Sequence, residues 1–243
     1  MNSKNLNYNK KLIVIGIFGI AMGFLEAIVV VYLRKIYYPQ GFTFPSIILT
    51  PEMVSIEWLR ELTTIVMLAM IAILSGIDSF ERILYFLYTF AIWDIFYYLG
   101  LKLILNWPES LFTWDILFLI PVPWLSPVLA PILCSLTMLY ISIPLLYFKD
   151  RGYNVKFKYY QWTLTISGAL LIFISFIFDY SKIIIENNLL YDFFNLLQNK
   201  EFIKINSEFI PTHFNWLIFI TGEILILIAA THSIISKKKQ IKN

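Results

Sequence analysis

The chain alternates long apolar runs with shorter polar connections. The first run, residues 12–33, contains a single charged residue, Glu26, and follows Lys10 and Lys11. A helix needs about 20 apolar residues to cross the roughly 30 Å core of a bilayer, so this run is long enough to span it. The same pattern predicts five further transmembrane helices. They are expected at residues 57–76, 81–104, 124–148, 159–179 and 212–236.

Two of the connections have a pattern of their own. Residues 108–120 begin with a proline, stop before Pro121 and are too short to span, which predicts a re-entrant or interfacial half-helix. Residues 180–210 mix apolar and charged side chains and predict an amphipathic helix on the outer face. No internal repeat is visible. The expected fold class is therefore all-α, a polytopic transmembrane bundle of six spans forming one integral membrane domain over residues 1–243.

Composition supports the membrane class and narrows the chemistry. The chain is 59% hydrophobic and 14% charged, against about 25% charged in soluble proteins. Its single cysteine, Cys134, excludes an intramolecular disulfide. Its two histidines, His213 and His232, lie about 28 Å apart on one predicted helix and cannot share a haem. No glycine-rich nucleotide-binding motif is present. The cofactor is therefore left open, with a carboxylate-bound divalent cation as the option that the acids suggest.

The basic residues predict how the bundle is oriented. A cytoplasmic N-terminus puts 12 of the 19 lysines and arginines on the cytoplasmic side, as the positive-inside rule requires. These are Lys4, Lys10, Lys11, Arg82, Lys149, Arg151, Lys156, Lys158, Lys237, Lys238, Lys239 and Lys242. We expect a plasma (cytoplasmic) membrane protein with both termini cytoplasmic and with the lipid bilayer as its partner. This bias accounts for the net charge of +3, so no nucleic-acid partner is expected.

Tryptophan agrees with this orientation. Five tryptophans would lie near the outer interface as an aromatic belt. They are Trp58, Trp107, Trp114, Trp124 and Trp216.

Glu26 is the first candidate functional residue, because ionisable groups inside a span are costly. It follows Gly16, Gly19 and Gly23 at spacings of 3, 4 and 3 residues, which puts all four on one stripe of the first helix. Glycines allow another helix to approach closely, so the carboxyl on the stripe must face protein. The alternative is a structural packing seam in which a neighbouring hydroxyl satisfies the carboxyl.

A second group of candidates lies on the third span. Asp94, Tyr98 and Lys102 recur at intervals of four residues and therefore share a face. Asp94 and Lys102 are about 12 Å apart along the axis, too far for direct contact. Tyr98 could bridge them, or each could have its own partner. Lys102, near the outer end, could also extend its amine to the interface.

The remaining candidates come from other elements. Arg60 and Glu61 open the second span, where Arg60 can pair with Glu57 one turn earlier. Asp115 lies in the predicted half-helix, and Glu223 lies near the middle of the last span. Prolines around the entry to the fourth span indicate a broken helix of the kind that lines transporter cavities, or a simple kink. They are Pro121, Pro123, Pro127 and Pro131.

Together these residues predict an outward-facing acidic site. It would contain five acids and two bases, so that either some carboxyls are protonated or the site holds a cation. The predicted binding residues are Glu26, Arg60, Glu61, Asp94, Tyr98, Lys102, Asp115 and Glu223. A structural ion-pair network is the competing interpretation.

Three functions fit this pattern. The first is transport or binding of a small cationic or proton-coupled solute. The second is an intramembrane enzyme acting on a lipid-linked or outer-leaflet substrate, using carboxylates with or without a divalent metal. The third is a non-catalytic subunit or assembly factor that binds a membrane protein partner. We favour the first, because an acidic cavity needs no particular catalytic spacing.

Overall fold

The computed structural model describes residues 8–47, 49–120, 122–189, 199, 202, 204–205 and 208–242. Six helices in these ranges are long and apolar enough to cross a membrane, which confirms a multi-pass helical membrane protein. The helices are α1 (Tyr8–Tyr37), α2 (Pro51–Ser75), α3 (Ser79–Leu105), α4 (Leu129–Asp150), α5 (Tyr159–Glu186) and α7 (Trp216–Lys242).

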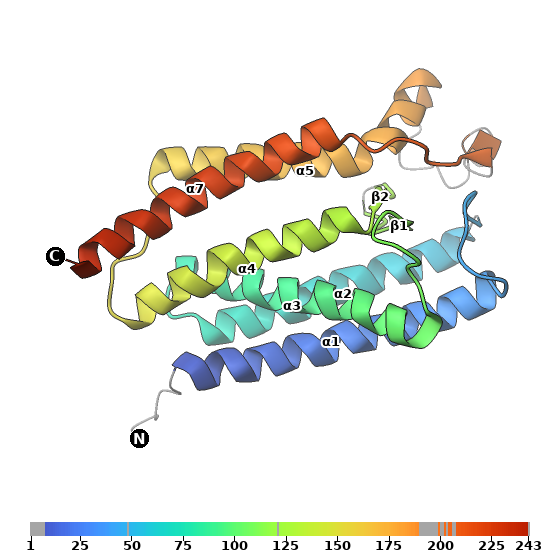
Figure 1. The fold of residues 1–243 in the computed structure, drawn as a ribbon. Coiled ribbons are helices and arrows are strands. Elements are labelled where there is room, and N and C mark those ends of the chain that lie inside the picture. Colours follow the sequence, from blue (N-terminus) through green and yellow to red (C-terminus); the bar gives the residue numbers. More distant parts are fainter. Residues whose placement is uncertain are drawn as a thin grey trace.

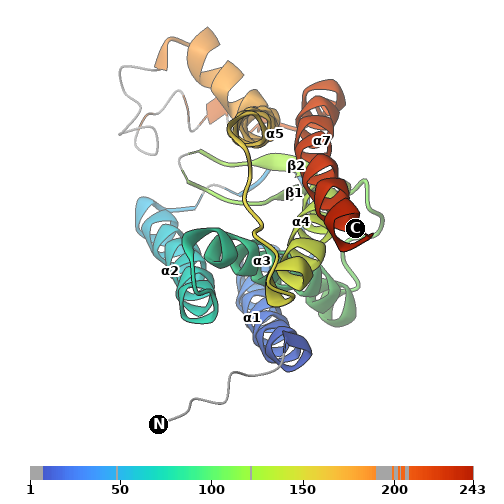
Figure 2. The ribbon, with the colours of Figure 1, turned by 90° about the vertical axis from the view of Figure 1, so that its left-hand side faces the viewer.

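The helices run side by side in two groups. Helices α1 to α4 form one group and the α5–α7 pair forms the other (Figures 1 and 2). Within the first group α3 is central and packs against α1, α2 and α4, while α7 packs on α4 and joins the groups. Helix α1 begins and α7 ends at the same end of the bundle, which we call the terminal end (Figure 1). The connections 38–50 and 106–128 lie at the opposite end, which we call the distal end (Figure 1).

Glycines set the closest helix contacts. The three glycines of the predicted stripe on α1 all face α3, and a Cβ built on Gly23 would lie 2.5 Å from the carbonyl oxygen of Trp93. On α5 and α7, a Cβ on either Gly168 or Gly222 would lie 2.6 Å from the other glycine's carbonyl oxygen. Each pair of helices can therefore approach only because these positions lack a side chain.

Local signals explain why several helices begin and end where they do. The Thr50 hydroxyl accepts a hydrogen bond from the Met53 amide, and Pro51 occupies the first turn, so α2 begins earlier than predicted. Asp78 caps α3 in the same way through the Glu81 amide. Helix α3 ends at Asn106, whose backbone is left-handed with a φ of 53°.

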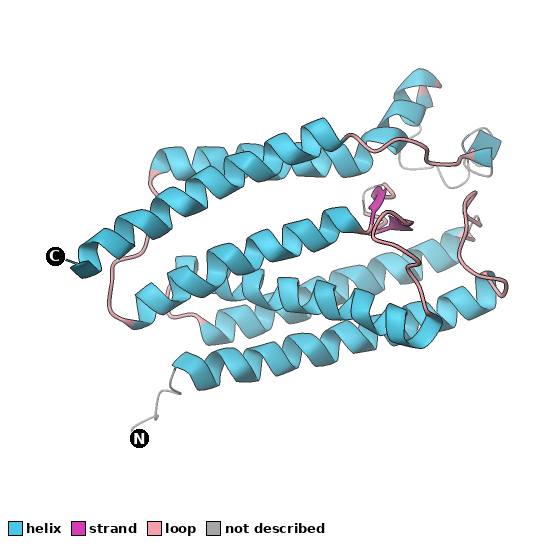
Figure 3. Ribbon diagram, in the orientation of Figure 1, coloured by secondary structure: helices cyan, strands magenta, loops and turns pink. Residues whose placement is uncertain are grey.

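The predicted half-helix over 108–120 is wrong. The segment forms a turn and then strand β1 (Trp114–Ile116), which pairs antiparallel with β2 (Leu125–Pro127) (Figure 3). A short apolar run can form either a strand or a helix. Here residues 114–116, which follow Pro108, pair with residues 125–127 of the same connection. Because β2 occupies the predicted start of the fourth span, α4 begins only at Leu129.

The predicted amphipathic helix over 180–210 is only partly described. Helix α5 continues through its first residues to Glu186. Residues 190–198, 200–201, 203 and 206–207 lie outside the described part of the chain, so an amphipathic helix there stays a prediction.

Candidate functional site

A cavity of about 570 Å³ lies toward the distal end of the bundle, between α1 to α4 and α5. Residues of the connections 38–50 and 106–128 also line it. Its volume falls within the range of about 300–1,000 Å³ that is typical of small-molecule sites. The cavity is therefore large enough to hold an organic ligand.

The cavity gathers most of the charges that were predicted to form a site. Five carboxyl and two guanidinium side chains line it, and Tyr98 lines it as well. The charged residues are Glu26, Glu57, Glu61, Asp94, Asp115, Arg34 and Arg60. They come from α1, α2, α3 and β1, so the fold brings together charges that are far apart in the sequence.

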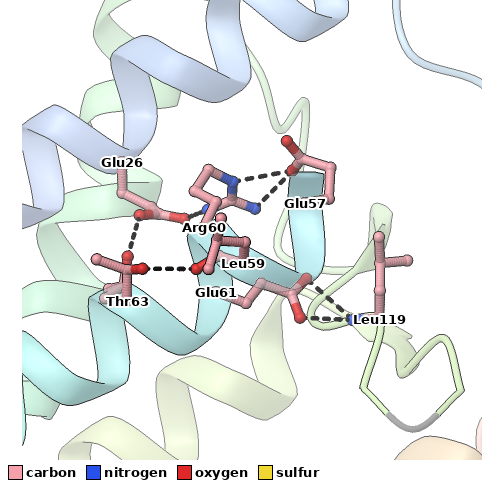
Figure 4. Close-up of polar contacts among 8 residues, drawn as sticks. Glu26, Glu57, Leu59, Arg60, Glu61, Thr63 and Leu119 are labelled. Atoms are coloured by element: carbon pink, nitrogen blue, oxygen red, sulfur yellow. Dashed lines mark hydrogen bonds and ion pairs between the residues drawn. The ribbon is translucent and has the colours of Figure 1, made fainter. Parts of the chain in front are cut away.

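Glu26 and Arg60 form the centre of the first polar cluster. Arg60 forms an ion pair with Glu26 across α1 and α2 and a second one, of 2.8 Å, with Glu57 on its own helix (Figure 4). The Thr64 hydroxyl donates a hydrogen bond of 3.0 Å to Glu26. The Arg60 guanidinium therefore pairs with two carboxylates, those of Glu26 and Glu57. The Thr64 hydroxyl provides one further hydrogen bond to Glu26.

Glu61 follows Arg60 in sequence but points elsewhere. Its carboxylate accepts the backbone N–H of Leu119, with the amide nitrogen 3.0 and 3.1 Å from its two oxygens (Figure 4). Leu119 lies between β1 and β2, so Glu61 fixes this connection to α2. The side chain is buried and lines the cavity.

Arg34 and Asp115 form a second polar cluster. A guanidinium nitrogen of Arg34 lies 2.9 Å from a carboxylate oxygen of Asp115, and Tyr98 donates a hydrogen bond of 3.2 Å to the other oxygen. The guanidinium also stacks on Trp107, 3.6 Å from its ring centre, and lies 4.5 Å from that of Phe42. Burial raises the pKa of Asp115 above its ordinary value, and the Arg34 charge opposes that shift.

Asp94 occupies a third position in the cavity wall. It accepts a hydrogen bond of 2.8 Å from the hydroxyl of Ser135 on α4. Like Glu61, it makes no ion pair with any lysine or arginine in the described ranges. Two carboxyls of the cavity therefore depend on neutral donors alone.

The structure places two of the predicted binding residues, Lys102 and Glu223, outside the cavity lining. Lys102 donates to the carbonyl oxygens of Asn106 and Pro108 at the end of α3 and does not line the cavity. Glu223 accepts a hydrogen bond of 2.7 Å from Thr137 between α7 and α4, also away from the cavity lining. Tyr98 donates to Asp115, and Asp94 and Lys102 have separate partners, which is the second of the two alternatives left open for this face of α3.

Two residues of the site were not among the predicted binding residues. Glu57 was considered only as a residue with which Arg60 can pair, and Arg34 was not considered as a candidate. A signal for Arg34 existed, because Glu26, Val30 and Arg34 recur every four residues, and all three line the cavity.

The charges of the cavity do not balance. Five carboxyls face two guanidinium groups, an excess of three carboxyls. Within the described residues, no three histidine, cysteine, aspartate or glutamate side chains come close enough together to hold a metal ion.

Comparison with known proteins gives no family. The chain matches no protein-family model, and no curated protein and no solved structure is significantly similar to it.

Proposed function

We propose that the protein binds a small cationic solute in this cavity and carries it across the membrane, coupled to protons. The observation that supports the proposal is the excess of three carboxyls over guanidinium groups in one cavity. Glu61 and Asp94 are central, because each is buried and has only neutral hydrogen-bond donors as partners.

The excess of carboxyls over guanidinium groups matters because these carboxyls are buried. A carboxylate that is removed from water is stable only if a proton or a nearby cation neutralises it. A cationic solute and protons would then compete for the same carboxyls. Such competition is the physical basis of proton-coupled exchange.

The orientation completes the proposal. With both termini in the cytoplasm of a plasma-membrane protein, as the basic residues predict, the distal end faces outward. The cavity then lies in the outer half of the membrane, where it would take up solute from outside.

Uptake by reconstituted vesicles tests this function. Proteoliposomes with an imposed pH gradient should accumulate tetramethylammonium or benzyltrimethylammonium faster than empty vesicles. Glu61→Gln and Asp94→Asn should each lower that rate at least about ten-fold, because each removes one neutralisable charge. Glu109→Gln is the matched control, since Glu109 is exposed and does not line the cavity. Uptake of neither cation would reject transport and favour a structural subunit. Full rates in both amide variants would reject the role of these two carboxyls in transport.

A second candidate function is an intramembrane enzyme acting on a lipid-linked or outer-leaflet substrate. The largely apolar and aromatic lining at membrane depth favours it. Such an enzyme would use its carboxyls as acid and base, with or without a divalent metal. A deletion strain with an altered lipid profile, together with vesicles that show no cation uptake, would select this candidate.

A further inference from the structure

Five aromatic side chains form a continuous surface along the cavity, which we call the aromatic wall. The ring centroids of successive neighbours are 5.0, 6.3, 5.2 and 6.0 Å apart. All five rings line the cavity. In order from α3 to α5, they belong to Phe90, Trp93, Phe118, Trp124 and Phe176.

The wall connects the two helix groups. Phe90 and Trp93 lie on α3, Phe118 and Trp124 in the connection before α4, and Phe176 on α5. Phe176 and Trp124 are stacked with an interplanar angle of 19°. The aromatic wall therefore runs from α3 to α5, whereas the charged residues of the lining other than Asp94 lie on α1, α2 and β1.

The two unpaired carboxyls lie beside this wall. Asp94 directly follows Trp93 on α3, and both line the cavity. Glu61 accepts the amide of Leu119, which directly follows Phe118. A carboxyl group therefore lies next to the aromatic wall at two positions, Asp94 beside Trp93 and Glu61 near Phe118.

This combination selects a class of cation. Aromatic rings attract organic ammonium ions, and the attraction strengthens when water is excluded. A hydrated inorganic ion would leave the aromatic wall without a partner. Building on the proposed function, we infer that the substrate is an organic ammonium ion with an aromatic or bulky apolar body. The ammonium group binds at Glu61 and Asp94, and the apolar body lies on the aromatic wall.

Two water-soluble, permanently charged probes separate the charge from the apolar body. Binding of tetramethylammonium and benzyltrimethylammonium to the purified full chain in nanodiscs is measured by calorimetry. We expect benzyltrimethylammonium to bind at least about ten-fold more tightly, because only its ring covers the wall. Equal affinities would overturn the inference and leave the cation site intact. Binding of neither probe would overturn the proposed function itself.

A variant of the wall provides the second arm. Phe176→Ala should weaken the binding of benzyltrimethylammonium alone, so that the affinities of the two probes differ by no more than about three-fold. Phe148→Ala is the matched control, since both phenylalanines are 6% exposed and only Phe176 lines the cavity. A preference unchanged by Phe176→Ala, or abolished equally by Phe148→Ala, would contradict a role for the wall. If Phe176→Ala does not fold, Phe176→Leu is used and the wild-type preference still decides.

Discussion

Arg60 of α2 forms an ion pair with Glu26 of α1 inside the bundle, and both residues line the cavity. The two helices otherwise pack mainly against α3, so this contact is a principal link between them. Arg60 also holds Glu57, and removing it would leave two buried carboxyls without a cation.

Replacing Arg60 by methionine should therefore destabilise the protein strongly. We expect the free energy of unfolding to fall by about 3–5 kcal/mol, the usual cost of leaving a buried charge unpaired. Unfolding in detergent, followed by tryptophan fluorescence, measures it. Combining Arg60→Met with Glu26→Gln should cost less than the sum of the two changes. A loss below about 1 kcal/mol for Arg60→Met would show that the ion pair is not structural.

The contact between α1 and α3 gives a second prediction. Gly23→Ala places a methyl group against the Trp93 carbonyl, which belongs to a helix backbone and cannot move aside easily. We expect a loss of about 1–3 kcal/mol, as for overpacked cores. Ala21→Val, at an exposed position of the same helix, should change stability by no more than about 0.5 kcal/mol. Equal effects of the two changes would contradict a close seam at Gly23.

Much of this fold could be predicted from the sequence. Hydropathy identified all six spans, because a long apolar helix satisfies its own backbone hydrogen bonds inside a bilayer and exposes apolar side chains to lipid. The spacing of Gly16, Gly19 and Gly23 indicated a packing stripe, which α3 occupies. Residues 106–128 were misjudged, since their strand pairing depends on contacts between Trp114 to Ile116 and Leu125 to Pro127 that no local pattern specifies.

The site was predicted in part for a related reason. Charges inside spans, such as Glu26 and Asp94, are visible in the sequence because they are costly there. Arg34 lies near the end of α1, where a basic residue is not unusual, and only the fold places Asp115 beside it. Glu223 is an equally unusual charge within a span. It does not line the cavity, however, and one of its carboxylate oxygens accepts a hydrogen bond from Thr137.

Arg34 provides a third prediction. Lysine at this position keeps the charge but loses the planar contact with Trp107 and the directed bond to Asp115. Arg34→Lys should lower the free energy of unfolding by about 1–2 kcal/mol, since a desolvated cation–π contact is worth about that much. Arg34→Gln should cost more, because it leaves Asp115 buried without a cation. Equal stability of wild type and both variants would contradict this role.

The terminal end gives a prediction about pH. Lys149 of α4 donates to Asp78 at the start of α3 and lowers the pKa of that carboxyl. The stabilisation is present above the ordinary aspartate pKa of about 3.9 and is lost as the pH falls through the lower folded value. Because the Asp78 side chain is 50% exposed, Asp78→Asn should cost only about 0.2–1 kcal/mol at pH 7.

The variant isolates the ion pair, because asparagine caps a helix about as well as aspartate. Unfolding of wild type and Asp78→Asn is compared from about pH 7 down to about pH 2, and the difference should vanish at the acid end. A difference that stays constant over this range would mean that the charge of Asp78 contributes nothing.

The central claim is that unpaired carboxyls in the cavity hold a cation. Its most direct test is equilibrium binding of benzyltrimethylammonium to the purified wild type, to the Glu61→Gln/Asp94→Asn double variant and to Glu109→Gln. We expect saturable binding of one cation per chain to wild type and Glu109→Gln, and binding at least about 100-fold weaker in the double variant. Unchanged affinity in a folded double variant, or no saturable binding to the wild type, would contradict it.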